Sequence, residues 1–415
     1  MPDVSFDNLL IVAVIAVAAP MLIGFRPSLR IPAVVLEIVA GVVVGESGLG
    51  WVEADLPVSI LAVLGLAFLL FLAGLEIDLH RLRGRLLSIA LLGFAFTLAL
   101  GIVAGGGFAA AGWISDPLLL AITLSATSLG LVVPVLKDAG QANSDSGQVT
   151  IAGATVADFG AVILLSLLFS SSNGSSGERL ALLIVFGALI AASVAVITQS
   201  GRSMRLGDVL TALQDTTAEI RVRLAVVLLV GFVVLAERFG LESILGAFLA
   251  GAVVGLVDRD SASHPHFRVK LEAIGYGFLV PVFFVTSGLR LDLTGLLDSP
   301  SALARVPLFL LALLLIRGLP ALLYVSTIGR RPALAAALLQ ATSLPFIVAA
   351  TQIGMDLGEL SAVNGTALVM AGLLSVLVFP PIALGIMRGA PAADEPADQI
   401  APAAGTSNSA PQEHR

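Results

Sequence analysis

The chain has 415 residues, of which 57% are hydrophobic and 12% are charged, and its formal net charge is −7 at pH 7. This apolar content exceeds what a soluble domain can bury, so the sequence predicts helices that lie mostly in a lipid bilayer. The apolar runs are continuous, unlike the alternating strands of a membrane barrel. There is no basic block for nucleic acid, and the lack of cysteine excludes disulfides and thiolate metal sites.

Thirteen apolar segments follow one another along the chain, and we expect each to cross the membrane. Their approximate bounds are 8–24, 32–49, 57–75, 86–111, 117–136, 147–169, 179–198, 222–239, 242–257, 271–289, 303–326, 332–352 and 361–387. The loops after odd-numbered segments and the C-terminal tail hold 17 of the 22 Lys and Arg residues, and the even-numbered loops hold four. Because positive charge marks the cytoplasmic side, this pattern favours 13 (or 12) spans, with the N-terminus outside and the C-terminus in the cytoplasm.

Three stretches need a separate interpretation. The first segment contains a cleavage-like Ala-Val-Ala, but acidic residues and no cation precede it, so we expect an uncleaved span. Apolar residues recur at helical spacing within 199–221, which predicts a helix on the inner membrane surface that links two halves of the chain. The tail, 391–415, is rich in Ala, Pro and acidic residues and is predicted to be disordered.

Asp158 is the only charged residue between Ile151 and Phe169, a run long enough to span a membrane. An ionised carboxylate at that depth costs at least about 3 kcal/mol, so such a residue usually faces a cavity, a partner or a transported ion. Thr155 lies three residues earlier, on the same face of the helix. The alternative is a structural carboxylate that is hydrogen-bonded to its neighbours.

Two segments carry helix-breaking residues at their centres. The string Ala-Thr-Ser-Leu occurs at 126–129 and again at 341–344, in segments that run in opposite directions, which predicts an inverted repeat. Glycine and proline interrupt helical pairing, and hydroxyl side chains can take up the freed backbone groups. Paired interruptions of this kind indicate the binding site of a transporter. The residues concerned are Thr127, Ser128, Gly130, Pro134, Thr342, Ser343 and Pro345.

These residues together predict a site for a hard cation. Thr127, Ser128 and Thr155 can offer neutral oxygens beside the carboxylate of Asp158, and oxygen ligands suit an ion such as sodium. A carboxylate can hold a proton or a metal cation but not both at once, and this competition can drive exchange. We therefore expect cation and proton binding at these four residues.

Three other charged residues near the segments are less diagnostic. Arg317, the only cation inside a segment, is expected to offset carbonyl-rich helix ends or to pair with a carboxylate, rather than to bind the ion directly. Glu37 lies in the second segment, either near the membrane face or in a binding role. Glu76 is interpreted as part of an interfacial charge cluster at the end of the third segment.

Six stretches in order resemble the monovalent cation:proton antiporter-2 family, which includes bacterial sodium/proton and Kef-type potassium/proton antiporters. They lie at 31–50, 66–79, 126–140, 157–168, 245–255 and 277–293, and the resemblance extends over about residues 8–390. It implies a homodimer in which 1–390 form the antiporter domain. Segments within 86–169 and 303–387 would form a mobile, ion-carrying core that moves like an elevator. Segments within 8–75 and 222–289 would form the dimer scaffold, with 179–198 as the linker.

The resemblance also bears on stoichiometry. Where this chain has Ala157, electrogenic relatives carry a second Asp, many potassium-type relatives Gln and electroneutral relatives often Asn, so the chain differs from all three. A single titrating carboxylate nevertheless favours electroneutral exchange, as does Arg317, which replaces a Lys of electrogenic relatives. Kef-type relatives end in a nucleotide-binding domain, which this sequence lacks, so gating of that kind is not expected.

The sequence thus predicts a non-enzymatic, multi-pass antiporter of a bacterial inner membrane that needs no cofactor. It would exchange protons for a monovalent cation, with sodium preferred to potassium. A sodium-coupled symporter of organic anions is the alternative, and it would need more polar residues at the interrupted segments. A channel would need a continuous polar stripe, and an intramembrane metalloprotease would need a His-Glu-x-x-His motif; the sequence has neither.

Overall fold

The computed structural model describes residues 5–25, 32–76, 84–169, 219–257 and 266–388, with isolated positions between 181 and 192. Within these ranges every regular element is helical, and nine helices are long and apolar enough to cross a membrane. Two shorter apolar helices, Ala33–Val44 and Ser243–Val257, accompany them. The prediction of an all-α membrane protein is confirmed, whereas the count of 13 spans stays a prediction. Most of the predicted linker span, most of the surface helix within 199–221, and the tail lie outside the described residues.

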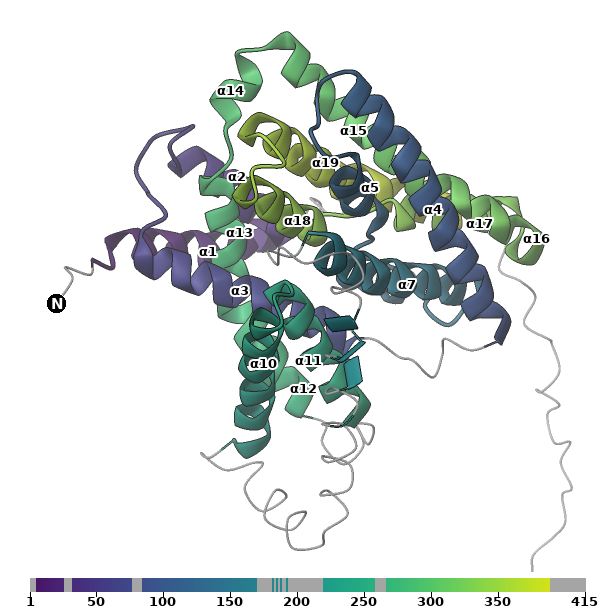
Figure 1. Cartoon of the computed structure of the whole chain (residues 1–415), viewed down its shortest axis with the longest axis horizontal. Coiled ribbons are helices and arrows are strands. Elements are labelled where there is room, and N and C mark those ends of the chain that lie inside the picture. The colour runs from purple at the N-terminus through teal and green to yellow at the C-terminus, as the bar shows by residue number, and fades with distance from the viewer. Residues whose placement is uncertain are drawn as a thin grey trace, which may run out of the picture.

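One group of helices forms the lower left of the molecule in Figure 1. Within it, α3 packs against α11 and α13, α2 packs against α13, and α10 packs against α11. The group comprises α1 (Asp7–Phe25), α2 (Ala33–Val44), α3 (Leu56–Leu75), α10 (Ile220–Arg238), α11 (Ser243–Val257), α12 (Phe267–Ile274), the π-helical turn η1 (Gly275–Leu279) and α13 (Val280–Leu289).

A second group occupies the upper right of the same view (Figure 1). Here α4 packs against α5 and α7, and α19 packs against α15, α17 and α18. The group comprises α4 (Gly84–Ala110), α5 (Pro117–Ser125), α6 (Leu129–Asp138), α7 (Asp145–Leu168), α15 (Pro300–Gly318), the 3₁₀ helix η2 (Leu319–Tyr324), α16 (Val325–Ile328), α17 (Arg330–Gln340), α18 (Pro345–Asp356) and α19 (Ala362–Arg388). The short helix α14 (Leu293–Leu297) lies between α13 and α15 in the chain.

Local sequence signals explain where several helices begin. Asp116 caps α5 by accepting hydrogen bonds from the N–H groups of Leu118 and Leu119, and Pro117 occupies the first helical position. Ser144 caps α7 by accepting from the N–H of Gly147 at 3.1 Å. Both residues satisfy N–H groups that have no partner inside the helix, and proline loses nothing at that position.

Glycines let the helices of the first group approach closely. A Cβ atom on Gly251 of α11 would lie 1.8 Å from the carbonyl oxygen of Phe71 in α3, and one on Gly41 of α2 would lie 2.1 Å from the carbonyl oxygen of Val285 in α13. Real Cβ atoms do not approach other atoms so closely, so any side chain there would push the helices apart. Small residues commonly serve this purpose where helices pack within a membrane.

Two spans of the second group are interrupted where Ala-Thr-Ser-Leu occurs. Helix α5 ends at Ser125 and α6 begins at Leu129, while α17 ends at Gln340 and α18 begins at Pro345. We call the connecting residues, 126–128 and 341–344, the crossing. The backbone N–H of Ser128 donates to the carbonyl oxygen of Thr342 at 3.0 Å, so the main chains of the two interruptions are directly linked.

Candidate ion-binding site at the interrupted helices

The carboxylate of Asp158, on α7, caps the interruption between α5 and α6. Its Oδ1 accepts a hydrogen bond from the N–H of Thr127 at 2.9 Å, and its Oδ2 accepts one from the N–H of Leu129 at 3.1 Å. Leu129 is the first residue of α6, so the carboxylate lies at the positive end of that half-helix. The interruption therefore supplies donors that stabilise a negative charge deep in the protein.

The guanidinium group of Arg317, on α15, lies at the C-terminal end of the half-helix α17, where the helix dipole is negative. Its Nε donates to the carbonyl oxygen of Gln340 at 3.3 Å, and Gln340 is the last residue of α17. Nε and Nη2 also donate to Oγ1 of Thr127, and Nη1 donates to Oγ1 of Thr97 on α4 at 3.2 Å. The side chain is only 2% exposed, so its charge is balanced by these oxygens and by the negative end of α17.

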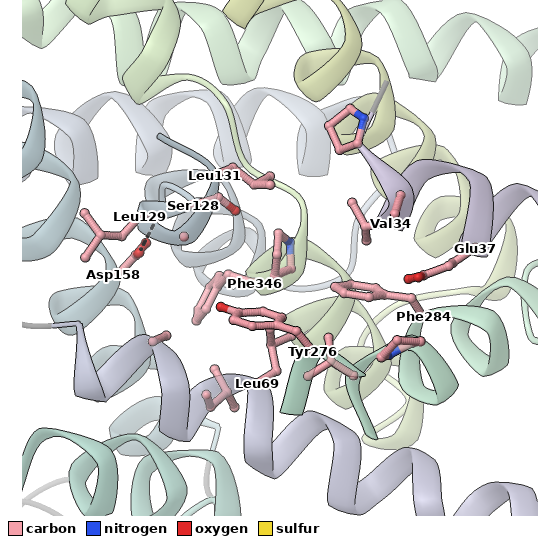
Figure 2. A pocket seen from close by; sticks show the side chains of 18 of the residues that line it. Val34, Glu37, Leu69, Ser128, Leu129, Leu131, Asp158, Tyr276, Phe284 and Phe346 are labelled. Carbon is pink, nitrogen blue, oxygen red and sulfur yellow. Dashed lines mark hydrogen bonds between the residues drawn. The ribbon is translucent and has the colours of Figure 1, made fainter. Parts of the chain in front are cut away.

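Asp158 lines a cavity of about 280 Å³ between the two groups of helices. Ser128 and Leu129 lie beside the carboxylate, and Tyr276 and Phe284 from the first group form part of the other wall (Figure 2). Most of the remaining lining is apolar. A carboxylate on such a cavity can meet a small cation or a proton without exposure to lipid.

The hydroxyl groups of the three other predicted ligands, Ser128, Thr127 and Thr155, point in different directions. Ser128 lines the same cavity as Asp158, and its Oγ accepts a hydrogen bond from the N–H of Leu344 at 3.4 Å. The hydroxyl of Thr127 instead donates to the carbonyl oxygen of Gln340 at 2.7 Å, away from the carboxylate. The hydroxyl of Thr155 donates to the carbonyl oxygen of Ile151, within its own helix, at 2.8 Å.

The remaining residues predicted from the helix interruptions have separate structural roles. The hydroxyl of Thr342 donates to the carbonyl oxygen of Leu338 at 3.1 Å, and the N–H of Ser343 donates to Oγ of Ser375 at 3.2 Å. The Oγ of Ser343 is buried and has no hydrogen-bond partner among the described residues. Pro345 begins α18, whereas Gly130 and Pro134 lie inside α6 rather than at its interruption.

A second and larger cavity, of about 740 Å³, lies next to the first. Thr155, Glu76 and Lys137 line it, and Gly130 and Tyr276 line both cavities. One carboxylate oxygen of Glu76 is buried without a hydrogen-bond partner in the described part of the chain. The wall shared by the two cavities therefore consists partly of Gly130, which has no side chain, and of the ring of Tyr276.

Sequence reasoning did not identify Thr97 or Gln340, although both contact Arg317. Gln340 immediately precedes the string Ala-Thr-Ser-Leu, and Thr97 is a polar residue within a long apolar run, so each left a weak signal. Their role depends on contacts between distant helices, and a single sequence does not reveal such contacts.

Comparison with known proteins agrees with this architecture. Residues 12–386 match the transmembrane sodium/hydrogen exchanger family, and the chain belongs to that family. This confirms the prediction, made from the six sequence stretches, that the chain is a member of the cation:proton antiporters.

Several named relatives share this similarity. A putative Na⁺/H⁺ antiporter of Bacillus subtilis, YjbQ, is 33% identical over 397 residues, which cover 92% of this chain and 63% of the relative. The Na⁺/H⁺–K⁺ antiporter GerN of Bacillus cereus is 28% identical over 365 residues, covering 85% of this chain and 89% of the relative. This chain thus spans less than two thirds of the length of the B. subtilis relative.

Among solved structures, the sodium/proton antiporter MjNhaP1 from Methanocaldococcus jannaschii at pH 8 has the same fold. The TM-score is 0.64 with 17% identical residues, and the alignment covers 92% of this chain and 98% of that one. At this level of identity the likeness supports the fold alone.

Proposed function

We propose that the protein exchanges protons for a monovalent cation across a membrane, with sodium preferred to potassium, and that Asp158 binds both. The observation that carries this proposal is the position of the carboxylate, which lines a cavity while the N–H groups of Thr127 and Leu129 hold it at the interrupted helix. Proton and cation compete for the same oxygens, so loading one releases the other. Membership of the sodium/hydrogen exchanger family supports the same activity.

The stoichiometry we propose is one cation for one proton, which makes the exchange electroneutral. Ala157 leaves a single carboxylate next to the interruption, so one group there titrates. Arg317 keeps its charge because a guanidinium group is always protonated in proteins, and its hydrogen bonds go to hydroxyl and carbonyl oxygens. The net charge of the loaded site is then the same with a proton as with a cation.

We further propose that the two groups of helices move relative to each other during transport. The group with α4–α7 and α15–α19 would carry Asp158 as a unit, and the group with α1–α3 and α10–α13 would form the scaffold of a homodimer. The cavity at Asp158 lies between them, which is where relative movement would change access. The site would thus face each side of a bacterial inner membrane in turn, with the N-terminus outside and the C-terminus in the cytoplasm.

A sodium-coupled symporter of organic anions is not favoured. The cavity at Asp158 has an apolar lining apart from a few polar groups, and none of the described residues that line it is Lys or Arg, which an organic anion would be expected to need.

Purified protein in liposomes with an internal pH dye tests the proposal. We expect sodium, and more weakly potassium, to drive proton movement at a rate that does not change when the membrane voltage is clamped. Asp158→Asn should abolish exchange and should also abolish the rise in melting temperature that sodium gives the original protein. Undiminished exchange in Asp158→Asn would contradict the assignment, and a rate that follows the voltage would contradict the stoichiometry.

A further inference from the structure

The cavity at Asp158 has a second carboxylate, Glu37, on its opposite side. Glu37 belongs to α2, and its side chain is only 5% exposed. Figure 2 shows the carboxylates of Glu37 and Asp158 at the two sides of the cavity, with the rings of Tyr276, Phe284 and Phe346 between them. Two helices, one from each group, therefore place an acidic group on the same cavity.

Within the described residues, no hydrogen bond or ion pair satisfies the carboxylate of Glu37. The helix that packs most closely on α2 is α13, whose ten residues include no titratable side chain. On α1, which also packs against α2, the one titratable residue is Asp7, in its exposed first turn. Among the described residues that line the cavity, the other titratable groups are Asp158 and Tyr276, and neither carries a positive charge.

A buried carboxylate without a partner is unfavourable, because burial removes part of the hydration that stabilises its charge. Such a residue inside a membrane is retained where an ion or a proton reaches it. No described residue of the cavity wall supplies a positive charge to Glu37, but a cation inside the cavity can supply it. Carboxylate oxygens prefer hard cations, which include sodium and potassium.

We propose that Glu37 is a second binding group for the monovalent cation, which it meets in the cavity on the way to Asp158. The inference rests on the proposed exchange function and adds a residue that attracts the cation without moving with it. Because α2 packs in the first group of helices and α7 in the second, the two carboxylates belong to different parts of the protein. Glu37 would therefore affect how readily the cation enters, and Asp158 would carry it.

Transport kinetics of Glu37→Gln in liposomes test this division of roles. We expect the KM for sodium to rise by about tenfold, which is within the usual range of coupling between two sites, while the maximal rate stays within about twofold. Glu37→Asp, which keeps a carboxylate, should recover most of the affinity. Asp158→Asn, by contrast, should lose the maximal rate.

Glu46→Gln is the matched control, because it removes the same charge from an exposed position just after the C-terminal end of α2. It should leave the KM unchanged. A Glu37→Gln variant whose KM equals that of Glu46→Gln would overturn the inference while leaving the exchange function intact. Absence of any cation-driven proton movement in the original protein would overturn both.

Glu37→Met gives a second test in case the glutamine variant does not fold. It replaces a buried carboxylate that has no partner among the described residues with an apolar side chain of similar length, a kind of change that is often neutral or stabilising. We expect a melting temperature without sodium that is equal to or above that of the original protein, together with the raised KM. An unchanged KM in a folded Glu37→Met protein would also overturn the inference.

Discussion

Arg317 and Asp158 contact the same residue, Thr127, from two sides. The guanidinium group donates to the hydroxyl of Thr127, and the backbone N–H of Thr127 donates to the carboxylate at 2.9 Å. The positive and negative charges of the site are thus coupled through one threonine at the crossing. Any change in the hydroxyl network of Thr127 is expected to alter the position of the donor that holds the carboxylate.

The first prediction concerns the hydroxyl of Thr127. Thr127→Val keeps the shape of the side chain but removes its hydroxyl group. Nη2 of Arg317 then loses its hydrogen-bond acceptor, and the carbonyl oxygen of Gln340 loses one of its two donors. We expect a loss of stability of about 1–3 kcal/mol, the usual cost of an unsatisfied buried polar group. Thermal unfolding in detergent measures this loss.

Thr127→Ser is the control for this substitution, because it keeps the hydroxyl group. Its melting temperature should stay close to that of the original protein. If the serine and valine variants melt at the same temperature, the hydroxyl does not contribute as described.

The second prediction concerns the planar geometry of Arg317. Arg317→Lys keeps a positive charge but cannot reach Thr97, Thr127 and Gln340 at once, because an ammonium group lacks the fork of a guanidinium group. We expect a lower melting temperature and slower exchange. Arg330→Lys, at an exposed position, should change neither, and equal behaviour of the two variants would contradict the role given to Arg317.

The third prediction concerns the contact between α3 and α11. Gly251→Val places a side chain where even a Cβ atom would lie 1.8 Å from the carbonyl oxygen of Phe71, so the helices must separate. We expect a marked loss of folded protein, measured as the monodisperse fraction after size-exclusion chromatography. Gly231→Ala, in α10, has no atom within 4 Å of the new Cβ and should gain about 0.5–1 kcal/mol in helical stability. Similar yields from both variants would contradict this packing.

The fourth prediction uses the absence of cysteine from the natural sequence. Ala73→Cys places a thiol on the wall of the cavity that holds Asp158. The reaction requires a thiolate and therefore water, which reaches this position through the cavity. A membrane-impermeant maleimide should thus label it only from the side of the membrane to which the cavity opens. Saturating sodium should slow the labelling by changing the population of open states.

Leu92→Cys is the control for the labelling experiment, since Leu92 is 63% exposed on the apolar outer surface of α4 and would face lipid. It should resist the reagent. Equal labelling of both positions, with no effect of sodium, would show that the cavity is not the route of access.

Much of this site could be predicted because its signals are local. Asp158 is a lone charge in an apolar run, and the repeated Ala-Thr-Ser-Leu marks positions where helical pairing fails. The orientation of the hydroxyl groups could not be predicted, since it depends on competition between partners. Spacing alone placed Thr155 on the face of Asp158, but its hydroxyl bonds to Ile151 in its own helix.

The partners of Arg317 lay beyond the reach of sequence reasoning for a different reason. Thr127 is 190 residues away and Thr97 is 220 residues away along the chain, so their contacts depend on how the helices pack. The same limit applies to Glu37, whose sequence position left a peripheral or a binding role open. Its place on the cavity of Asp158 depends on the packing of α2 against α13 beside the second group of helices.

The hydrogen bond between the N–H of Ser128 and the carbonyl oxygen of Thr342 joins the two interruptions through the main chain alone. Apart from proline at position 128, any amino acid would still supply the atoms of this bond. Both positions are buried, so substitutions of similar size there can change the ion preference while this main-chain link between the two interrupted spans is kept.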